Sequence, residues 1–279
     1  MIISVASGKG GTGKTTVSVA LAQSLGYCNF YDFDVEAPNS DIFLKPDINH
    51  YQKVYVKYPY FIKKEGVSFK ACSDFCHFNA IASINEDYIF FEELCHGCGG
   101  CILVGPEGYV REKDAEVGEI SKGFKSPGIY FFMGNLKPKS MRTSNIQVDL
   151  EKMLDRSQTV IIDSPPGNSC SMVNAVKNCD YCILVTEPTP YGLSDLKISI
   201  DVLKNLDKKF GIIINRDGIG NKELEDFCRQ NSYKILLKIP NDINIAKTYS
   251  KGGSLLDWDP KMKDKFLGII DGIREEVGR

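Results

Sequence analysis

Residues 8–15 read Gly-Lys-Gly-Gly-Thr-Gly-Lys-Thr and match the G-x-x-x-x-G-K-T pattern of a phosphate-binding loop. Glycines in such a loop let successive backbone N–H groups converge on phosphate oxygens, Lys14 reaches the β- and γ-phosphates, and the Thr15 hydroxyl ligates Mg²⁺. The motif therefore predicts a site for a nucleoside triphosphate and magnesium. The residues assigned to nucleotide binding here are Gly8, Lys9, Gly10, Gly11, Thr12, Gly13, Lys14, Thr15 and Thr16.

Cysteines form the second group of residues whose spacing indicates chemistry. The chain has ten of them, and one region holds C-x3-C at residues 72–76 followed by C-x2-C-x2-C at residues 95–101. No segment is typical of a signal peptide, because an apolar strand pattern begins at Met1 or Ile2, so the protein is expected to be cytoplasmic. Thiols stay reduced in that compartment, which indicates metal or redox chemistry before disulfides.

The pattern of apolar residues predicts the scaffold for these groups. Residues 2–6 are typical of a buried strand and residues 17–25 of a helix, so the phosphate loop lies at a helix N-terminus. Most of the chain alternates such segments, which predicts an α/β fold with a doubly wound, mostly parallel sheet covered by helices on both faces. Further strands are predicted at Cys28–Phe33, Gly128–Met133, Thr159–Ile162, Tyr181–Val185, Phe210–Ile214 and Lys234–Ile239.

The alternation is interrupted where the two cysteine groups lie. We therefore predict one domain formed by residues 1–54 and 118–279, with a small α+β domain inserted at residues 55–117. A chain of 279 residues, 43% of them hydrophobic, is long enough to bury a sizeable core in the larger domain.

Charge and hydropathy limit the partners. The net charge of −2 gives no electrostatic case for binding nucleic acid, and no apolar run is long enough to span a bilayer. An amphipathic helix is predicted at residues 266–277, with balanced charges that favour packing against the domain over binding anionic lipid. We expect neither a nucleic-acid nor a membrane partner.

The loop carries a second lysine, Lys9, in the order Lys-Gly-Gly-x-Gly-Lys-Thr, which resembles the deviant P-loop of the MinD, Mrp and ParA ATPases and of the nitrogenase iron protein. The resemblance implies a homodimer, or a heterodimer with a related ATPase, in which ATP lies between two subunits and Lys9 reaches the partner's nucleotide. The alternative is that Lys9 is one more cation near an anion, which predicts no dimer.

Two segments at strand ends resemble the switches of the same family. Residues 32–39 resemble switch I, which implies that Asp34 orients the attacking water and holds the Mg²⁺ shell through water, with Asp32 supporting that shell through water. Either aspartate can instead cap a loop. Residues 160–167 resemble Walker B and switch II, in which Asp163 holds Mg²⁺ through water and senses the γ-phosphate, and Gly167 offers an N–H near it.

Two further positions resemble the family's adenine site. Asn215 ends an apolar run, and its amide can satisfy both a donor and an acceptor on the purine edge. Pro240 lies in a segment similar to the loop that closes over the base, although Pro-Asn-Asp is also a common turn.

The insert resembles a bacterial-type ferredoxin that has lost part of its ligand set. The family pattern is C-x2-C-x2-C-x3-C-P twice, with the fourth cysteine of each motif ligating the other cluster. Aligned this way, Gly66, Phe69 and Gly105 replace cysteines, and Cys72 is left as a spare thiol. The resemblance implies one [4Fe-4S] cluster, whose ligands are Cys76, Cys95, Cys98 and Cys101. The alternatives are a cluster-free fold with buried thiols and a zinc site of four cysteines.

These predictions combine into a Mg²⁺-dependent, dimeric ATPase, with Lys9, Lys14, Asp34 and Asp163 as its catalytic residues. ATP binding and hydrolysis would be coupled to a conformational change in the iron-sulphur insert. The output would be electron transfer to a redox partner, or delivery of a cluster or metal cofactor to an accepting protein. The alternative is an ATP-driven positional or partner-recruitment switch with a structural insert. A ligase, by analogy with cobyrinate enzymes of this fold, is less favoured because the chain shows no glutaminase portion.

Overall fold

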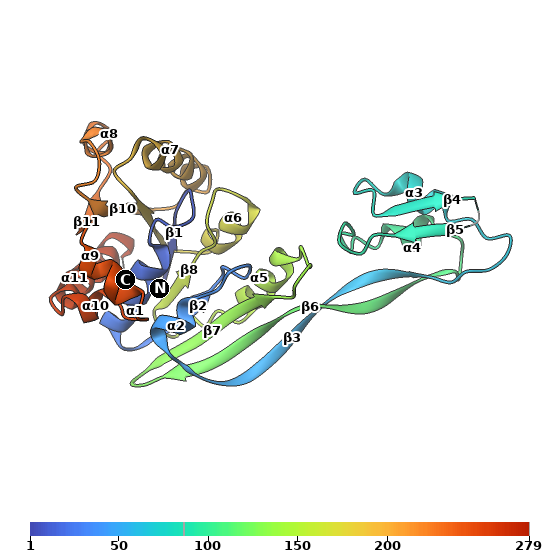
Figure 1. The fold of residues 1–279 in the computed structure, drawn as a ribbon, viewed down its shortest axis with the longest axis horizontal. Helices are drawn as coiled ribbons and strands as arrows, with labels where there is room; N and C mark the ends of the chain where they lie inside the picture. Colours follow the sequence, from blue (N-terminus) through green and yellow to red (C-terminus); the bar gives the residue numbers. More distant parts are fainter. Residues whose placement is uncertain (86, 279) are drawn as a thin grey trace.

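A single large sheet forms the centre of the protein in the computed structural model, which describes residues 1–85 and 87–278 (Figure 1). Within those ranges its nine strands run in the order β11-β10-β9-β1-β8-β2-β7-β6-β3. Neighbours from β11 to β7 are parallel, whereas β6 is antiparallel to both β7 and β3. The strands are β1 Ile2–Ala6, β2 Cys28–Asp32, β3 Asp47–Phe61, β6 Val110–Lys125, β7 Ile129–Leu136, β8 Val160–Asp163, β9 Tyr181–Thr186, β10 Phe210–Asp217 and β11 Ile235–Pro240.

Helices cover both faces of the parallel part of the sheet, because its strands are apolar on both sides. Ile2 and Ile3 are both fully buried, but they belong to different apolar clusters, one on each face. Helices α5 to α8 pack on the face of Ile2, while α1, α10 and α11 pack on that of Ile3. The helices of this domain are α1 Lys14–Leu25, α2 Ser40–Leu44, α5 Thr143–Lys152, α6 Cys170–Val176, α7 Pro190–Asn205, α8 Glu223–Gln230, α9 Ile243–Tyr249, α10 Leu255–Trp258 and α11 Met262–Val277.

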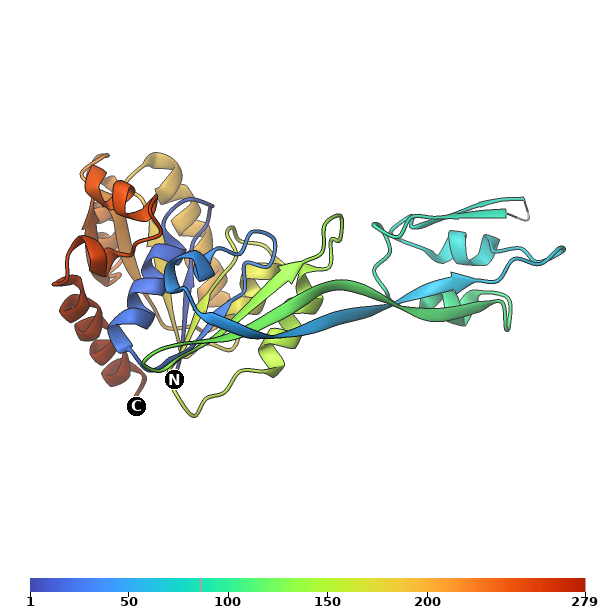
Figure 2. The same ribbon diagram turned by 60° about the horizontal axis from the view of Figure 1, so that its bottom comes forward.

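Strands β3 and β6 extend beyond the sheet as a twisted two-stranded ribbon that carries the insert at its far end (Figures 1 and 2). The boundaries predicted at residues 55 and 117 fall within these two strands, where Tyr55 pairs with Glu116. A small apolar cluster that includes Phe61, Phe69 and Cys72 forms the insert's own core. The elements of the insert are α3 Lys70–Phe75, β4 Ile81–Ile84, β5 Asp87–Phe90 and α4 Gly100–Val104.

The predicted mostly parallel sheet is confirmed, and each strand predicted for it overlaps an observed one. The predicted terminal helix is present as α11, with Phe266, Ile270 and Ile273 buried against the sheet. None of the helices in the described parts of the chain combines the length and the apolarity needed to span a membrane.

Candidate functional site

The phosphate loop lies where the carboxyl ends of the parallel strands meet, between β1 and α1. This is the edge at which open α/β sheets bind ligands. A cleft of about 400 Å³ opens there, and its walls come from the loop, from switch I and from the ends of β10 and β11. Gly11 and Gly13 have left-handed backbones (φ 77° and 97°), which side chains disfavour, and a Cβ on Gly13 would collide with the Asn215 amide. The residues of the predicted set that line the cleft are Gly10, Gly11, Gly13, Lys14, Thr15, Thr16, Asp34, Asn215 and Pro240.

Thr15, which lines this cleft, contacts the buried Asp163 at the end of β8. The Thr15 hydroxyl donates to Asp163 Oδ2 at 2.6 Å, while Asp163 Oδ1 is buried without a hydrogen-bond partner in the described residues. Burial raises the pKa of Asp163 to about 6, although Thr15 and Lys14 oppose the rise. A buried carboxylate oxygen without a donor, beside a hydroxyl, is an oxygen donor set that fits Mg²⁺.

Asp32 and Asp34 occupy different environments. Asp32 is fully buried at the end of β2 and does not line the cleft, and its carboxylate accepts hydrogen bonds from Ser40 Oγ (2.6 Å) and Asp34 N (3.0 Å). Burial and the nearby Asp163 raise the pKa of Asp32 to about 8. Asp34 does line the cleft; burial raises its pKa, and Lys14 lowers it. Asp32 therefore shapes the switch I loop, and Asp34 faces the nucleotide position.

Asn215 is engaged with the phosphate loop in this structure. Its Nδ2 donates to the Thr12 carbonyl at 2.8 Å, and its Oδ1 accepts from the Arg216 N–H at 2.9 Å. The cleft is completed by α9 through Ile245, Ala246 and Tyr249, which sequence reasoning missed because nothing in that segment distinguishes it from an ordinary surface helix.

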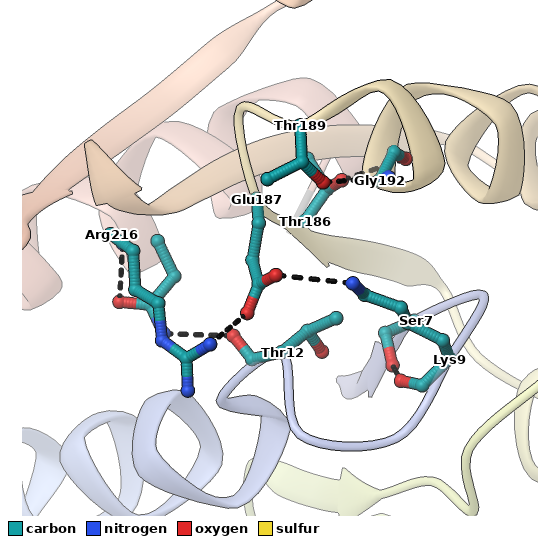
Figure 3. Close-up of polar contacts among 9 residues, drawn as sticks. Ser7, Lys9, Thr12, Thr186, Glu187, Thr189, Gly192 and Arg216 are labelled. Carbon is teal, nitrogen blue, oxygen red and sulfur yellow. Dashed lines mark hydrogen bonds and ion pairs between the residues drawn. The ribbon is translucent and has the colours of Figure 1, made fainter. Parts of the chain in front are cut away.

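Lys9 does not line the cleft, and its side chain pairs with Glu187, a residue that sequence reasoning also missed (Figure 3). Lys9 Nζ lies 3.1 Å from Glu187 Oε2, and Arg216 Nη1 lies 2.6 Å from Glu187 Oε1. The Glu187 side chain is 6% exposed and that of Lys9 is 35% exposed. Gly8 and Thr12 likewise lie outside the cleft, and a Cβ on Gly8 would collide with Asp195. The available signal for Glu187 was its place directly after β9, at the same sheet edge.

The four predicted cluster ligands line one pocket in the insert, although 18 residues separate Cys76 from Cys95 in the chain. Gly97 and Gly99 have left-handed backbones (φ 60° and 73°), which allow the 95–101 segment to curve around the pocket. The ring of Phe78 stacks on His96 at 3.5 Å, and both rings line the pocket.

Two of these sulphurs accept backbone hydrogen bonds. Ala80 N donates to Cys76 Sγ and Gly97 N donates to Cys95 Sγ, both at 3.4 Å. Such bonds stabilise thiolates and tune iron-sulphur clusters. Among the described residues no three Cys, His, Asp or Glu side chains converge closely enough to hold one metal ion. In a cubane each thiolate binds its own iron, so four thiols spread around one pocket fit that group.

The surroundings of Cys72, the predicted spare thiol, are filled with apolar side chains. Cys72 is fully buried, lies outside the pocket, and donates to the Cys101 carbonyl at 3.6 Å. Phe69, at a position predicted to have lost a cysteine, is also fully buried. A Cβ on Gly105 would lie 2.6 Å from the Cys101 oxygen and 2.9 Å from Cys72 Sγ, so no side chain fits there.

Comparisons with known proteins agree with the nucleotide-site geometry. A family model described as "CobQ/CobB/MinD/ParA nucleotide binding domain" matches residues 3–255. An uncharacterized protein of Methanocaldococcus jannaschii is 31% identical over 93% of this chain and 93% of its own length. The iron-sulfur cluster carrier protein of the same organism is 30% identical over 42% of this chain and 46% of its length. The septum site-determining protein MinD with Mg-ADP from Pyrococcus horikoshii OT3 has the same fold, with a TM-score of 0.59, 20% identity, and coverage of 99% and 97%.

Proposed function

The chain belongs to the CobQ/CobB/MinD/ParA nucleotide-binding family, and on this basis we propose that it is a Mg²⁺-dependent ATPase that acts as a nucleotide-driven switch. The observation that carries the proposal is the hydrogen bond from Thr15, which lines the cleft together with Lys14 and Asp34, to the buried Asp163. Lys14 binds the phosphates, Thr15 and Asp163 hold Mg²⁺, and Asp34 orients the attacking water. The full-length match to a MinD fold supports the switch more directly than any redox output.

The proposed switch is a dimer in which Lys9 binds the partner's nucleotide. In this structure Lys9 is held by Glu187 of its own chain, through an ion pair whose lysine side is about one-third exposed. Such a pair contributes at most about 1 kcal/mol, so nucleotide phosphates can compete for Lys9. Arg216 remains beside Glu187 after Lys9 leaves, so the carboxylate keeps a cation partner.

The test compares Lys14→Ala with Lys263→Ala, an exposed lysine on α11. We expect Lys14→Ala to lower phosphate release at saturating ATP at least about 100-fold, since it removes the cation that binds the transferring phosphate. Light scattering should give a dimer with ATP for the wild type and Lys263→Ala, and a monomer for Lys14→Ala. Equal phosphate release by both variants would refute the proposed site.

A second function is favoured by the cysteine pocket: the insert binds one [4Fe-4S] cluster and is the output that the switch controls. The shared pocket, the two N–H···S bonds and the partial match to an iron-sulfur cluster carrier protein support it. When bound, such a cluster accepts and donates one electron. The protein then delivers either an electron to a redox partner or the cluster to an accepting protein.

Iron and acid-labile sulphide per chain, measured after anaerobic reconstitution, test the cluster. We expect about four of each for the wild type and for Cys170→Ala, and far less for Cys98→Ala, because both cysteines are exposed but only Cys98 lines the pocket. An electron carrier keeps its iron through ATP turnover, whereas a cluster carrier loses it to an apo-acceptor. If the wild-type protein binds no iron, the cluster proposal is refuted, and the protein is a switch whose insert has a structural role.

A further inference from the structure

Helix α9 supplies one wall of the nucleotide cleft through Ile245, Ala246 and Tyr249. We propose that Tyr249, the last residue of this helix, is a further nucleotide-binding residue, whose hydroxyl donates a hydrogen bond to the phosphate chain of the bound nucleotide. The inference rests on the proposed ATPase function and adds a phosphate contact from outside the phosphate loop.

The side of α9 that lines the cleft is poorly covered by the rest of the chain. None of the seven residues of α9 is buried. Ile245 packs partly against the apolar cluster around α1, whereas Ala246 and Tyr249 are exposed. A surface helix normally buries its apolar face against the core. Here that face borders the cleft instead, so a nucleotide bound there covers both exposed side chains.

The two ends of α9 meet different parts of the cleft. The helix begins beside Pro240, at the predicted adenine end, where its N-cap residue Asp242 accepts a hydrogen bond from Trp258 Nε1 at 3.2 Å. At the other end, the centre of the Tyr249 ring lies 4.4 Å from that of Phe43 in α2, the helix that follows switch I. In the proposed site switch I faces the phosphates and Mg²⁺, so Tyr249 lies at the phosphate end of the cleft.

Packing and backbone hydrogen bonds hold the Tyr249 ring in place. Phe43 is 8% exposed and belongs to the apolar cluster around α1, and its ring is tilted by 31° from that of Tyr249. Gly252 N donates to the Tyr249 carbonyl at 2.9 Å and ends the helix. This turn rests on α2, since a Cβ on Gly252 would lie 3.3 Å from the Ile42 carbonyl oxygen. The phenol is therefore positioned before the nucleotide binds, which lowers the entropic cost of the contact.

The Tyr249 hydroxyl is a donor that the chain itself does not use. It forms no hydrogen bond with any residue in the described parts of the chain. Burial and the charge of Asp163 raise the pKa of Tyr249, so the hydroxyl is protonated at neutral pH and within electrostatic reach of the proposed Mg²⁺ ligand. A phenol O–H beside a multiply charged phosphate chain forms a charge-assisted hydrogen bond.

The experiment is a calorimetric titration of the full-length protein with Mg-ADP and with Mg-pyrophosphate, which has phosphates but neither base nor ribose. We expect Tyr249→Phe to weaken the binding of both by the same factor, about tenfold or more, because the ring stays and a hydrogen bond to a charged oxygen is lost. Tyr27→Phe is the matched control and should bind both as the wild type does, since Tyr27 is 66% exposed and lies outside the cleft.

Urea unfolding without nucleotide separates this contact from a structural role. Because the Tyr249 hydroxyl has no partner among the described residues, Tyr249→Phe should unfold at the same urea concentration as the wild type. Weaker binding accompanied by lower stability of the nucleotide-free variant would mean that the hydroxyl supports the fold, and would overturn the inference.

The two probes separate the remaining outcomes. Unchanged affinity of Tyr249→Phe for both probes would overturn the inference alone. A loss confined to Mg-ADP would also overturn it, because the hydroxyl would then bind the base or the ribose. Wild-type protein that binds neither probe would overturn the proposed nucleotide site, and the inference with it.

Discussion

The nucleotide cleft and the cysteine pocket are built in opposite ways. The cleft is formed at the ends of parallel strands whose two faces are covered by large apolar clusters. The pocket is formed by short helices and a two-stranded hairpin around a small cluster of buried residues. A core of that size contributes little stability by itself, and domains of this kind are usually completed by metals or disulfides. The comparison predicts a cleft that is stable without its ligand and an insert whose stability depends on binding the proposed cluster.

The largest expected effect comes from removing the cofactor. After iron is chelated, we expect amide exchange in β4, β5 and α4 to accelerate about 1,000-fold or more, because cofactor binding and folding of so small a core are linked. Amides of β1, β8 and β9 should keep their protection. Hydrogen exchange by mass spectrometry on reconstituted and chelated protein measures both regions at once. Equal protection of the insert in both samples would remove the contrast between the two regions.

The second prediction tests whether burial of Asp32 beside Asp163 lowers the stability of the folded protein at high pH. Burial and Asp163 raise the pKa of Asp32 to about 8, so the folded state keeps a proton that the unfolded state releases near pH 4. This contribution is present at low pH and is lost as pH rises from about 4 to about 8. We expect Asp32→Asn to be more stable than the wild type by about 2–4 kcal/mol at pH 9, with the difference shrinking towards pH 4.

Urea unfolding at pH 5, 7 and 9 without Mg²⁺ measures this difference. The amide oxygen of the variant still accepts the hydrogen bonds from Ser40, whereas its NH2 group cannot accept from the Asp34 N–H, and loss of that bond lowers the gain by about 1 kcal/mol at every pH. Adding Mg²⁺ and ADP should narrow the gap, because a cation offsets the repulsion between Asp32 and Asp163. A stability difference that does not change with pH would contradict the prediction.

The third prediction concerns the filled position beside the cysteine pocket. In Gly105→Ala the added methyl group meets the Cys101 oxygen and Val110 at 2.6 Å, so we expect the insert to lose about 1–3 kcal/mol. Gly268→Ala is the control, since no atom lies within 4 Å of its Cβ position. Exchange rates of insert amides give the local stability. Unchanged exchange rates of the insert amides would show that the side chains around Gly105 rearrange to accept the methyl group. The core of the insert would then be less rigid than its packing implies.

The fold could be predicted from the sequence where local patterns determine it. Apolar runs of strand length gave the parallel strands, and helical spacing gave α1 and α11. The length of β3 and β6 was not predicted, although Val54 and Val56 are buried while Tyr55 is exposed, as the alternation of a strand requires. That period-2 signal is weaker than an apolar run, and here the cysteine spacing drew the boundary instead.

The candidate sites could be predicted where residues that act together are close in sequence. The phosphate loop and the 95–101 cysteines are contiguous motifs, and these cysteines line one pocket, while their role as cluster ligands stays a prediction. Glu187 and Tyr249 carry no motif, and each contacts a residue far along the chain: Lys9 for Glu187 and Phe43 for Tyr249. Only the folded chain shows these contacts, because they depend on which strand ends and loops become neighbours.

The smallest expected effect concerns the ion pair between Lys9 and Glu187, beside the nucleotide cleft. This pair must break in the proposed dimer. In Glu187→Gln, Lys9 and Arg216 both lose their charged partner while the volume of the side chain is kept, so nucleotide affinity is measured alongside. We expect the ATP-dependent dimer to dissociate up to about thirtyfold less readily, because the dimer breaks two such ion pairs and each costs about 1 kcal/mol or less. Analytical ultracentrifugation with ATP measures the dissociation constant, with Lys9→Gln as the variant that should not dimerise. An unchanged dissociation constant would mean that Lys9 stays paired with Glu187 in the dimer. The phosphate loop would then be rigid throughout, and Lys9 would not act on the partner's nucleotide.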